Sequence, residues 1–185
     1  MSTPSLASIL ALEGPRRLHI GGKQPHPEWK ILNALPGEGV DHLGDVRDLS
    51  AFADESFDAL YASHVLEHLS YNGVLVEALK GLHRILRPGG KLLVSVPDLD
   101  VLCRLFVHDK LAAQDRFQVM RMMFGGQLDA YDFHYVGLNG EFLISFLQQA
   151  GFKAAFRVPS FGIFQDTSET KFAGVPISVN LVAVR

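Results

Sequence analysis

One stretch of the sequence restricts the fold more than any other, because it joins an amphipathic helix to an almost wholly apolar strand. Apolar residues recur there at the spacing of one helix face: Leu75, Leu79, Leu82 and Leu86. The sequence Pro88-Gly89-Gly90 is predicted to end the helix. Residues 91–96, Lys-Leu-Leu-Val-Ser-Val, then read as a central strand buried on both faces, which is typical of a parallel sheet.

The rest of the chain repeats this alternation. Strands are predicted at 17–20, 29–34, 40–43, 57–62, 152–158 and 177–184, and helices at 5–12, 98–107, 109–124 and 139–150. The pattern predicts an α/β fold with a Rossmann-like, doubly wound sheet. The sheet should be mainly parallel with an antiparallel C-terminal strand, because no helix separates the last two strands. Residues 1–185 are expected to form a single domain.

The first crossover of the predicted sheet is short. The connection between the first two strands is only the nine residues 21–29, counting the first residue of the second strand, whereas neighbouring parallel strands usually need a dozen or more between them. One face of the sheet should therefore be thinly covered at this point. We expect the N-terminal helix or a second subunit to cover it, and a homodimer is one way to provide that subunit.

Composition and charge narrow the functional classes. Hydrophobic residues make up 48% of the chain and charged residues 20%, as in globular proteins. The net charge of −3 provides no general attraction to nucleic acid or to an anionic membrane, and no stretch reaches the roughly 20 apolar residues of a membrane span. The start of the chain lacks the basic segment of a signal peptide, and the single Cys103 cannot form an internal disulfide. These features predict a cytoplasmic protein.

The first candidate site residues follow the first strand. Gly21-Gly22 comes directly after the apolar residues of 17–20. In doubly wound proteins ligands bind at the carboxyl ends of the strands, and glycine lets a ligand approach the backbone closely. A pair of glycines in this position also fits a plain turn, so Gly21-Gly22 indicates a ligand site only together with the segments that follow.

Five segments in this order and spacing resemble the class I S-adenosylmethionine-dependent methyltransferases. They are Leu18-His19-Ile20-Gly21-Gly22, Trp29-Lys30-Ile31-Leu32-Asn33, Gly44-Asp45-Val46-Arg47-Asp48-Leu49, residues 56–69 with Ser63-His64-Val65-Leu66-Glu67-His68-Leu69, and Leu86-Arg87-Pro88-Gly89-Gly90. The chain looks most like a compact subgroup of predicted methyltransferases with short early crossovers. The resemblance covers residues 17–97 well and continues more loosely toward residue 152.

The resemblance implies a binding site for S-adenosylmethionine. Its residues would be Gly21 and Gly22 beneath the amino-acid moiety, Asn33 at the ribose hydroxyls, Asp45 at the adenine amino group, Val46 on the adenine ring and Ser63 near the sulfonium. This chain departs from the family at two places. The family commonly has Gly-x-Gly where this chain has Gly21-Gly22-Lys23, and an acid where it has Asn33. Lys23 would either block the site or pair with the cofactor's carboxylate.

Two histidines are candidates for the chemistry. His64 follows the fourth strand, where the resemblance places the methyl acceptor, and His134 lies in a loop expected to cover the site. Histidine is a general acid–base candidate near neutral pH, although Asp132 and His134 also fit an ordinary hydrogen-bonded pair. Residues 98–137 are expected to form the acceptor pocket. The acceptor would be a small molecule or a sugar of a cell-surface glycan.

Two other functions fit parts of the sequence. Lys23 and Asn33 also fit a non-catalytic binding module whose cofactor site has lapsed. The segment His64-Val65-Leu66-Glu67-His68 matches H-x-x-E-H, in which His64 and His68 would share a helical face and bind Zn²⁺ in a hydrolase, with Glu67 as the base. Because no clear downstream acid follows, the methyltransferase interpretation is preferred, and it predicts no metal site.

Overall fold

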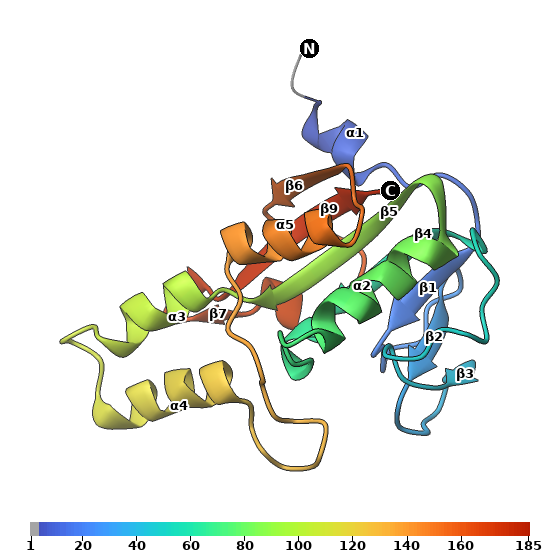
Figure 1. Cartoon of the computed structure of the whole chain (residues 1–185). Helices are drawn as coiled ribbons and strands as arrows, with labels where there is room; N and C mark the ends of the chain where they lie inside the picture. Colours follow the sequence, from blue (N-terminus) through green and yellow to red (C-terminus); the bar gives the residue numbers. More distant parts are fainter. Residues whose placement is uncertain (1–3) are drawn as a thin grey trace.

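A seven-stranded sheet forms the centre of the computed structural model, which describes residues 4–185 (Figure 1). The strand order is β3-β2-β1-β4-β5-β9-β6, with bounds β1 (Arg17–Ile20), β2 (Lys30–Asn33), β3 (His42–Leu43), β4 (Phe57–Ser63), β5 (Leu86–Pro97), β6 (Ala154–Val158) and β9 (Ser178–Val184). The first five pair in parallel, and β9 lies antiparallel between β5 and β6. This confirms the predicted Rossmann-like sheet with an antiparallel C-terminal strand. Strands β7 (Lys171–Phe172) and β8 (Val175–Pro176) form a separate hairpin.

The helices follow the predicted positions closely. They are α1 (Leu6–Leu10), α2 (Val74–Ile85), α3 (Leu99–Phe106), α4 (Ala113–Phe124) and α5 (Gly140–Gln149), with short 3₁₀ helices η1 (Leu66–His68) and η2 (Thr167–Glu169). Local chemistry sets their ends. The Asn139 side chain accepts a hydrogen bond from the Phe142 N–H at 2.8 Å and so caps the start of α5. Gly151, at φ +103°, ends α5 in a Schellman motif in which the Phe152 N–H bonds the Leu147 carbonyl.

The predicted stop at Pro88-Gly89-Gly90 is displaced by a few residues. Helix α2 ends at Ile85, and the chain enters β5 at Leu86. The Pro-Gly-Gly sequence therefore lies within the first residues of the strand, where the pairing with β4 shifts register. Position 90 has no room for a side chain, because a Cβ on Gly90 would lie 2.9 Å from the Arg87 carbonyl oxygen and 3.0 Å from that of Asp58.

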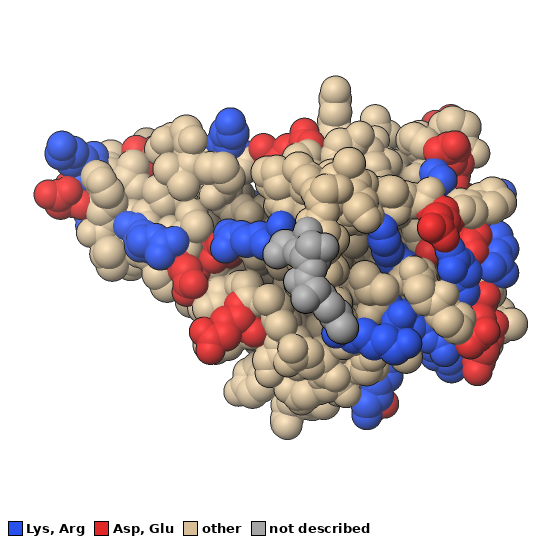
Figure 2. Space-filling view, turned by 90° about the horizontal axis from the view of Figure 1, so that it is seen from above, with Lys and Arg blue, Asp and Glu red and all other residues tan. Residues whose placement is uncertain are grey.

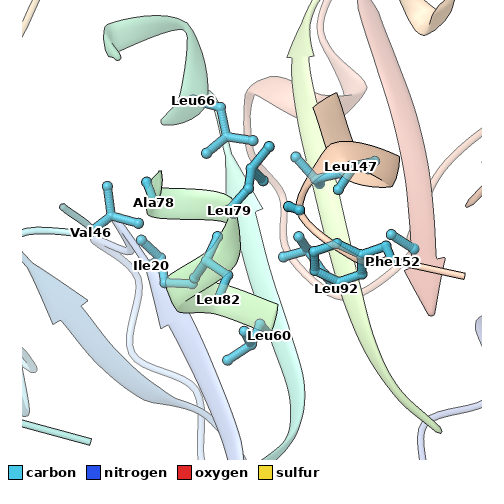
Figure 3. Close-up of a cluster of buried hydrophobic side chains, with 14 of the residues drawn as sticks. Ile20, Val46, Leu60, Leu66, Ala78, Leu79, Leu82, Leu92, Leu147 and Phe152 are labelled. Atoms are coloured by element: carbon cyan, nitrogen blue, oxygen red, sulfur yellow. The ribbon is translucent and has the colours of Figure 1, made fainter. Parts of the chain in front are cut away.

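The larger core lies between the sheet and the pair α2 and α5, which lie side by side on one face (Figures 1 and 3). Helix α2 contributes the residues that its periodicity predicted, all fully or almost fully buried: Leu75, Ala78, Leu79, Leu82 and Ile85. They pack on the alternate residues of β4 and β5 that point to this face, among them Leu60 and Leu92. This packing holds the carboxyl ends of the central strands in place.

The opposite face is covered mostly without helices. Tyr61 of β4 and Leu93 of β5 point to this side and pack with Trp29, Phe161 and Phe164. Three partly buried residues of the N-terminal segment, Ile9, Leu10 and Leu12, join the cluster. The expected cover by the N-terminal helix is therefore confirmed in part. The remainder comes from residues 159–169, which the sequence did not predict.

Helices α3 and α4 extend from the carboxyl end of β5 and pack mainly on one another (Figure 1). A small separate core holds them, formed by Leu102, Leu105, Val119 and Ile177. Along residues 4–185, the structure contains no helix whose length and apolar character would let it cross a membrane.

Charged residues gather at the amino end of the parallel strands. Figure 2 views the molecule from the α1 side, where basic and acidic side chains are interspersed. The buried carboxylate of Asp58 is the centre of one such group. It accepts hydrogen bonds from the backbone and side chain of Arg16 at 2.8–3.2 Å and from Arg87 Nε at 3.0 Å. The Arg16 hydrogen bond holds the pKa of Asp58 below its ordinary value, and Arg87 adds to the effect.

We expect Asp58→Asn to lower the free energy of unfolding by about 1–3 kcal/mol at pH 7, since it weakens several charge-assisted hydrogen bonds. Because the folded pKa of Asp58 is lowered, the wild type keeps this stabilisation above the ordinary aspartate pKa of about 4 and loses it as the pH falls further. Urea unfolding between pH 7 and pH 3 should therefore show the two proteins converging at low pH. Asp109→Asn, which changes an exposed carboxylate, is the control. A constant difference across this range would contradict the assignment.

Candidate active site

A cleft of about 710 Å³ opens at the carboxyl ends of β1, β2, β3 and β4. Five of the predicted site residues line it: Gly21, Asn33, Asp45, Val46 and His64. The opposite wall comes from the loop that follows α4, with Leu128, Tyr131, Asp132 and Tyr135. Two hydrogen bonds fix this loop beside η1: the Tyr135 N–H donates to the Glu67 carbonyl at 2.8 Å, and His68 Nδ1 bonds the Phe133 carbonyl at 3.1 Å.

Gly21 lies where the chain leaves β1 and enters the cleft wall. Its φ is +72°, and its N–H donates to the Leu32 carbonyl at 2.8 Å. A Cβ at Gly21 would lie 2.7 Å from Val65 Cγ2 and would otherwise meet open space among the described residues. Glycine is thus required by the backbone conformation and by the neighbouring cleft residue.

The structure places two other predicted residues behind the wall. Gly22 is not a lining residue, and a Cβ on it would lie 2.7 Å from the ring of His19, away from Val65. Ser63 also does not line the cleft, and its hydroxyl is buried without a hydrogen-bond partner among residues 4–185. Contact with a cofactor stays a prediction for both residues.

Asn33 and Asp45 reach the cleft with their polar groups already engaged. The Asn33 amide donates to the Gly22 carbonyl at 2.9 Å, and its oxygen accepts from the Leu35 N–H at 2.9 Å. Asp45 accepts from Arg47 at 2.6–2.9 Å through both carboxylate oxygens, and this hydrogen bond lowers the pKa of Asp45. Asp45 is therefore an oriented, ionised acceptor on the cleft wall. Lys23 also lines the cleft, which agrees with its predicted position near a bound cofactor.

His64 is held in an unusual backbone conformation at the end of β4. Its φ is +54°, which only a few per cent of residues other than glycine adopt. The Ser178 hydroxyl donates to the Thr167 carbonyl at 3.0 Å and so accepts from His64 Nε2 at 2.9 Å. A neutral His64 then carries its proton on Nε2, and its Nδ1 lone pair faces Glu67 Oε1 at 3.3 Å.

The side chains of Glu67 and His64 lie in contact without a hydrogen bond between them among the described residues. Burial raises the pKa of Glu67 to about 8 and lowers the pKa of His64 to about 4, so both groups favour their neutral forms. The Glu67 side chain is only 1% exposed. The pair provides a group that can take up or release a proton at the edge of the cleft.

The H-x-x-E-H interpretation was wrong in its geometry. His64 and His68 do not share a helical face, because His64 has a left-handed backbone and η1 begins only at Leu66. His68 instead packs against His134, with ring centroids 4.8 Å apart. His134 does not line the cleft, but it lies beside Glu67 and His68 in the site. Burial lowers the pKa of His134, and the nearby His68 adds to this effect.

Sequence reasoning missed two contributions to the site. Arg47 lines the cleft, and Ser178 orients His64 across 114 residues of chain. Arg47 could have been proposed from the sequence, because it stands two residues after Asp45. Ser178 carries no sequence signal for this role, because only the folded sheet brings it to the site. Tyr135 also lines the cleft, and it belongs to residues 98–137, which were expected to form the acceptor pocket.

Comparison with known proteins agrees with this geometry. Residues 29–94, which contain β2 to β4, most of β5 and most of the strand-end residues of the cleft, match the family model described as "Methyltransferase domain". Over these residues the chain is similar to a methyltransferase domain. No curated protein matches the chain.

Solved structures share the fold of this chain at low sequence identity. An S-adenosylmethionine-dependent methyltransferase from Mesorhizobium loti is 17% identical, with 97% of this chain and 95% of that one covered and a TM-score of 0.60. The 1,6-didemethyltoxoflavin-N1-methyltransferase of Burkholderia thailandensis, whose structure holds S-adenosylhomocysteine, is 15% identical over 92% and 71% of the two chains, with a TM-score of 0.55. A possible exported protein from Bordetella parapertussis is 12% identical, with a TM-score of 0.57. The chain spans 63% of that protein's length, and 94% of this chain is covered.

The cleft fits a nucleoside cofactor. Its volume lies in the range of about 300–1,000 Å³ that small-molecule sites occupy. Gly21 brings its backbone to the cleft surface, and Asp45 offers a carboxylate. Apolar side chains of Ile20, Leu32 and Val46 complete the wall.

Proposed function

We propose that the methyltransferase domain binds S-adenosylmethionine in this cleft and transfers its methyl group to a small molecule or to a sugar of a glycan. The observation that carries the proposal is the arrangement of Gly21, Asp45 and Val46 along the cleft, at the carboxyl ends of the parallel strands β1 and β3. The S-adenosylhomocysteine in the Burkholderia structure supports the same cofactor for a protein of this fold. The net charge of −3 supports an acceptor other than nucleic acid, and the lone Cys103 supports a cytoplasmic location.

Each wall residue has a role that its position allows. Gly21 would let the amino-acid moiety lie against the backbone, Val46 would pack on the adenine ring, and Asp45 would accept a hydrogen bond from its amino group. Lys23 would pair with the cofactor's carboxylate. The bound cofactor supplies an electrophilic methyl group on a positively charged sulfur. The domain's main contribution is then to hold donor and acceptor in line at about 3–3.5 Å.

The acceptor would enter from the side of the loop. Tyr131 and Tyr135 line the cleft there, and Tyr135 also borders a second cavity of about 420 Å³ with Tyr71, Phe142 and Phe146. Aromatic walls of this kind suit a flat or sugar ring, since they provide large apolar contact with a polar rim. His64 lines the cleft beside Glu67 and would provide a polar acid–base group near the acceptor.

Thermal unfolding with S-adenosylhomocysteine tests the cofactor site. A ligand at 100 times its dissociation constant adds about 2.7 kcal/mol to the native state, which for a chain of this size raises Tm by roughly 5–10 °C. We expect such a rise in the wild type and a smaller one in Asp45→Asn. Asp41→Asn is the matched control, because Asp41 is also ion-paired, to Lys30, but does not line the cleft.

The alternative is a binding module that keeps the fold without the cofactor. It is favoured by Asn33, which stands in the place of an acid and uses both its amide groups on Gly22 and Leu35. No rise in Tm at millimolar S-adenosylhomocysteine would establish this alternative and exclude methyl transfer.

A further inference from the structure

We propose that Glu67, His68 and His134 form a binding site for a divalent transition-metal ion of the Zn²⁺ type beside the cleft. Each of the three residues offers one ligand atom, and these atoms all lie within 4.8 Å of one another. Two imidazole nitrogens and one carboxylate oxygen are a donor set that proteins use for Zn²⁺ and for neighbouring first-row ions. The set differs from the H-x-x-E-H motif, because His134 comes from a loop and His64 is not part of it.

The carboxylate of Glu67 is the first observation behind the site. It is almost completely buried, and neither of its oxygens forms a hydrogen bond with any group in residues 4–185. A buried polar group without partners is costly and uncommon in folded proteins. His64 Nδ1 lies 3.3 Å from one of these oxygens without a hydrogen bond to it. A cation held between the carboxylate and the two other ligands would satisfy the carboxylate oxygens.

The ring of His68 is the second observation. Its Nδ1 lies 3.1 Å from the Phe133 carbonyl oxygen, and a carbonyl can only accept, so Nδ1 carries the proton. The lone pair of a neutral His68 is therefore on Nε2. Metal-binding histidines are commonly oriented in this way, with one ring nitrogen donating to a backbone carbonyl and the other bound to the ion.

The spacing of the ligands is close to what an ion requires. Ligand atoms about 2.0–2.1 Å from a tetrahedral Zn²⁺ lie roughly 3.3 Å apart. The three atoms here all lie within 4.8 Å of one another, so small side-chain rotations would bring them to this spacing. The two sides of the site are already fixed to one another, because the Tyr135 N–H bonds the Glu67 carbonyl and His68 bonds the residue before His134.

The position of the site indicates the class of acceptor, and this part rests on the proposed methyl transfer. His68 lines the cleft, and three protein ligands leave a coordination position open to a hydroxyl group. A bound ion lowers the pKa of such a hydroxyl, so its proton leaves to solvent. The oxygen then forms a bond with the methyl carbon while the carbon–sulfur bond of S-adenosylmethionine breaks and S-adenosylhomocysteine leaves. A metal ion here therefore favours oxygen acceptors.

The test is metal binding by the full chain, freed of any affinity tag and treated with EDTA. Isothermal titration with Zn²⁺ should give one bound ion per chain. Co²⁺ bound by the same nitrogen and oxygen ligands should give a visible absorption spectrum. His134→Gln and Glu67→Gln should each weaken Zn²⁺ binding at least about tenfold. His108→Gln, which changes an exposed histidine between α3 and α4, should leave it unchanged.

Two outcomes would overturn the site: the wild type binding no stoichiometric Zn²⁺, or His134→Gln binding it as tightly as the wild type. His134 is a partly exposed loop residue, so this variant gives a result even if Glu67→Gln does not fold. The rise in Tm with S-adenosylhomocysteine is measured on the same metal-free protein. A rise in Tm without Zn²⁺ binding would contradict the metal site alone. Zn²⁺ binding without a rise in Tm would contradict the proposed methyl transfer alone.

Discussion

Gly21→Ala is expected to weaken S-adenosylhomocysteine binding about 100-fold, which corresponds to about 2.7 kcal/mol. Two effects act together. The backbone at Gly21 has φ +72°, where an L-residue costs roughly 1–2 kcal/mol, and the new Cβ would lie 2.7 Å from Val65 Cγ2. Both Gly21 and Val65 line the cleft, so relief of this contact moves the wall against which the cofactor would lie.

Gly174→Ala separates these two effects. Gly174 has a similar φ of +78°, but a Cβ there would meet no atom within 4 Å among the described residues, and it lies in the β7–β8 turn outside the cleft. Isothermal titration with S-adenosylhomocysteine should show wild-type affinity for Gly174→Ala. Equal affinities for Gly21→Ala and the wild type would show that the cofactor does not lie against this glycine.

Leu79→Ala is expected to lower the free energy of unfolding by about 2–5 kcal/mol, because it leaves a cavity in the larger core. Leu79 is fully buried and lies on the inner face of α2, between Leu66 and Leu147 (Figure 3). These neighbours belong to η1 and α5, which are held by their own packing and close poorly around a void. In a chain of this size the loss corresponds to a fall in Tm of roughly 4–20 °C.

Lys80→Ala on the same helix is the control. Lys80 is half exposed and pairs with Glu77 at the surface, so its loss should change the unfolding free energy by less than about 0.5 kcal/mol. Urea unfolding of both variants measures the difference. A similar small change for Leu79→Ala would mean that α2 does not pack on the sheet as the structure has it.

Local patterns explain why so much of the sheet could be predicted. The apolar period of α2, the caps Asp98 and Asn139 and the glycine end at Gly151 each act within a few residues of their own position. The strand ends follow from the same patterns. Because chain direction places the carboxyl ends of parallel strands along one edge, Gly21, Asn33 and Asp45 could be assigned to one cleft before their contacts were known.

Contacts between distant residues decided the features that the sequence did not predict. Residues 159–169 have no strong period, yet they cover the second face of the sheet through Phe161 and Phe164. The Tyr61 hydroxyl anchors them by donating to Asp166 at 2.8 Å, across 105 residues of chain. The H-x-x-E-H motif was misread for the same reason, since the left-handed backbone of His64 depends on its contacts with Ser95 and Ser178.

The sequence by itself determined the α/β class, the mainly parallel sheet with its antiparallel end, and the edge at which a ligand would bind. These features depend on the periodicity of apolar residues and on chain direction, which residues close together in the sequence specify. Only the tertiary structure decided which polar groups meet at that edge. The hydrogen bond from His64 to Ser178 and the grouping of Glu67, His68 and His134 join the end of β4 and η1 to a strand and a loop more than 60 residues away. Burial then sets the charge of these groups, because the cost of removing a carboxylate or an imidazolium from water depends on what surrounds it in the fold.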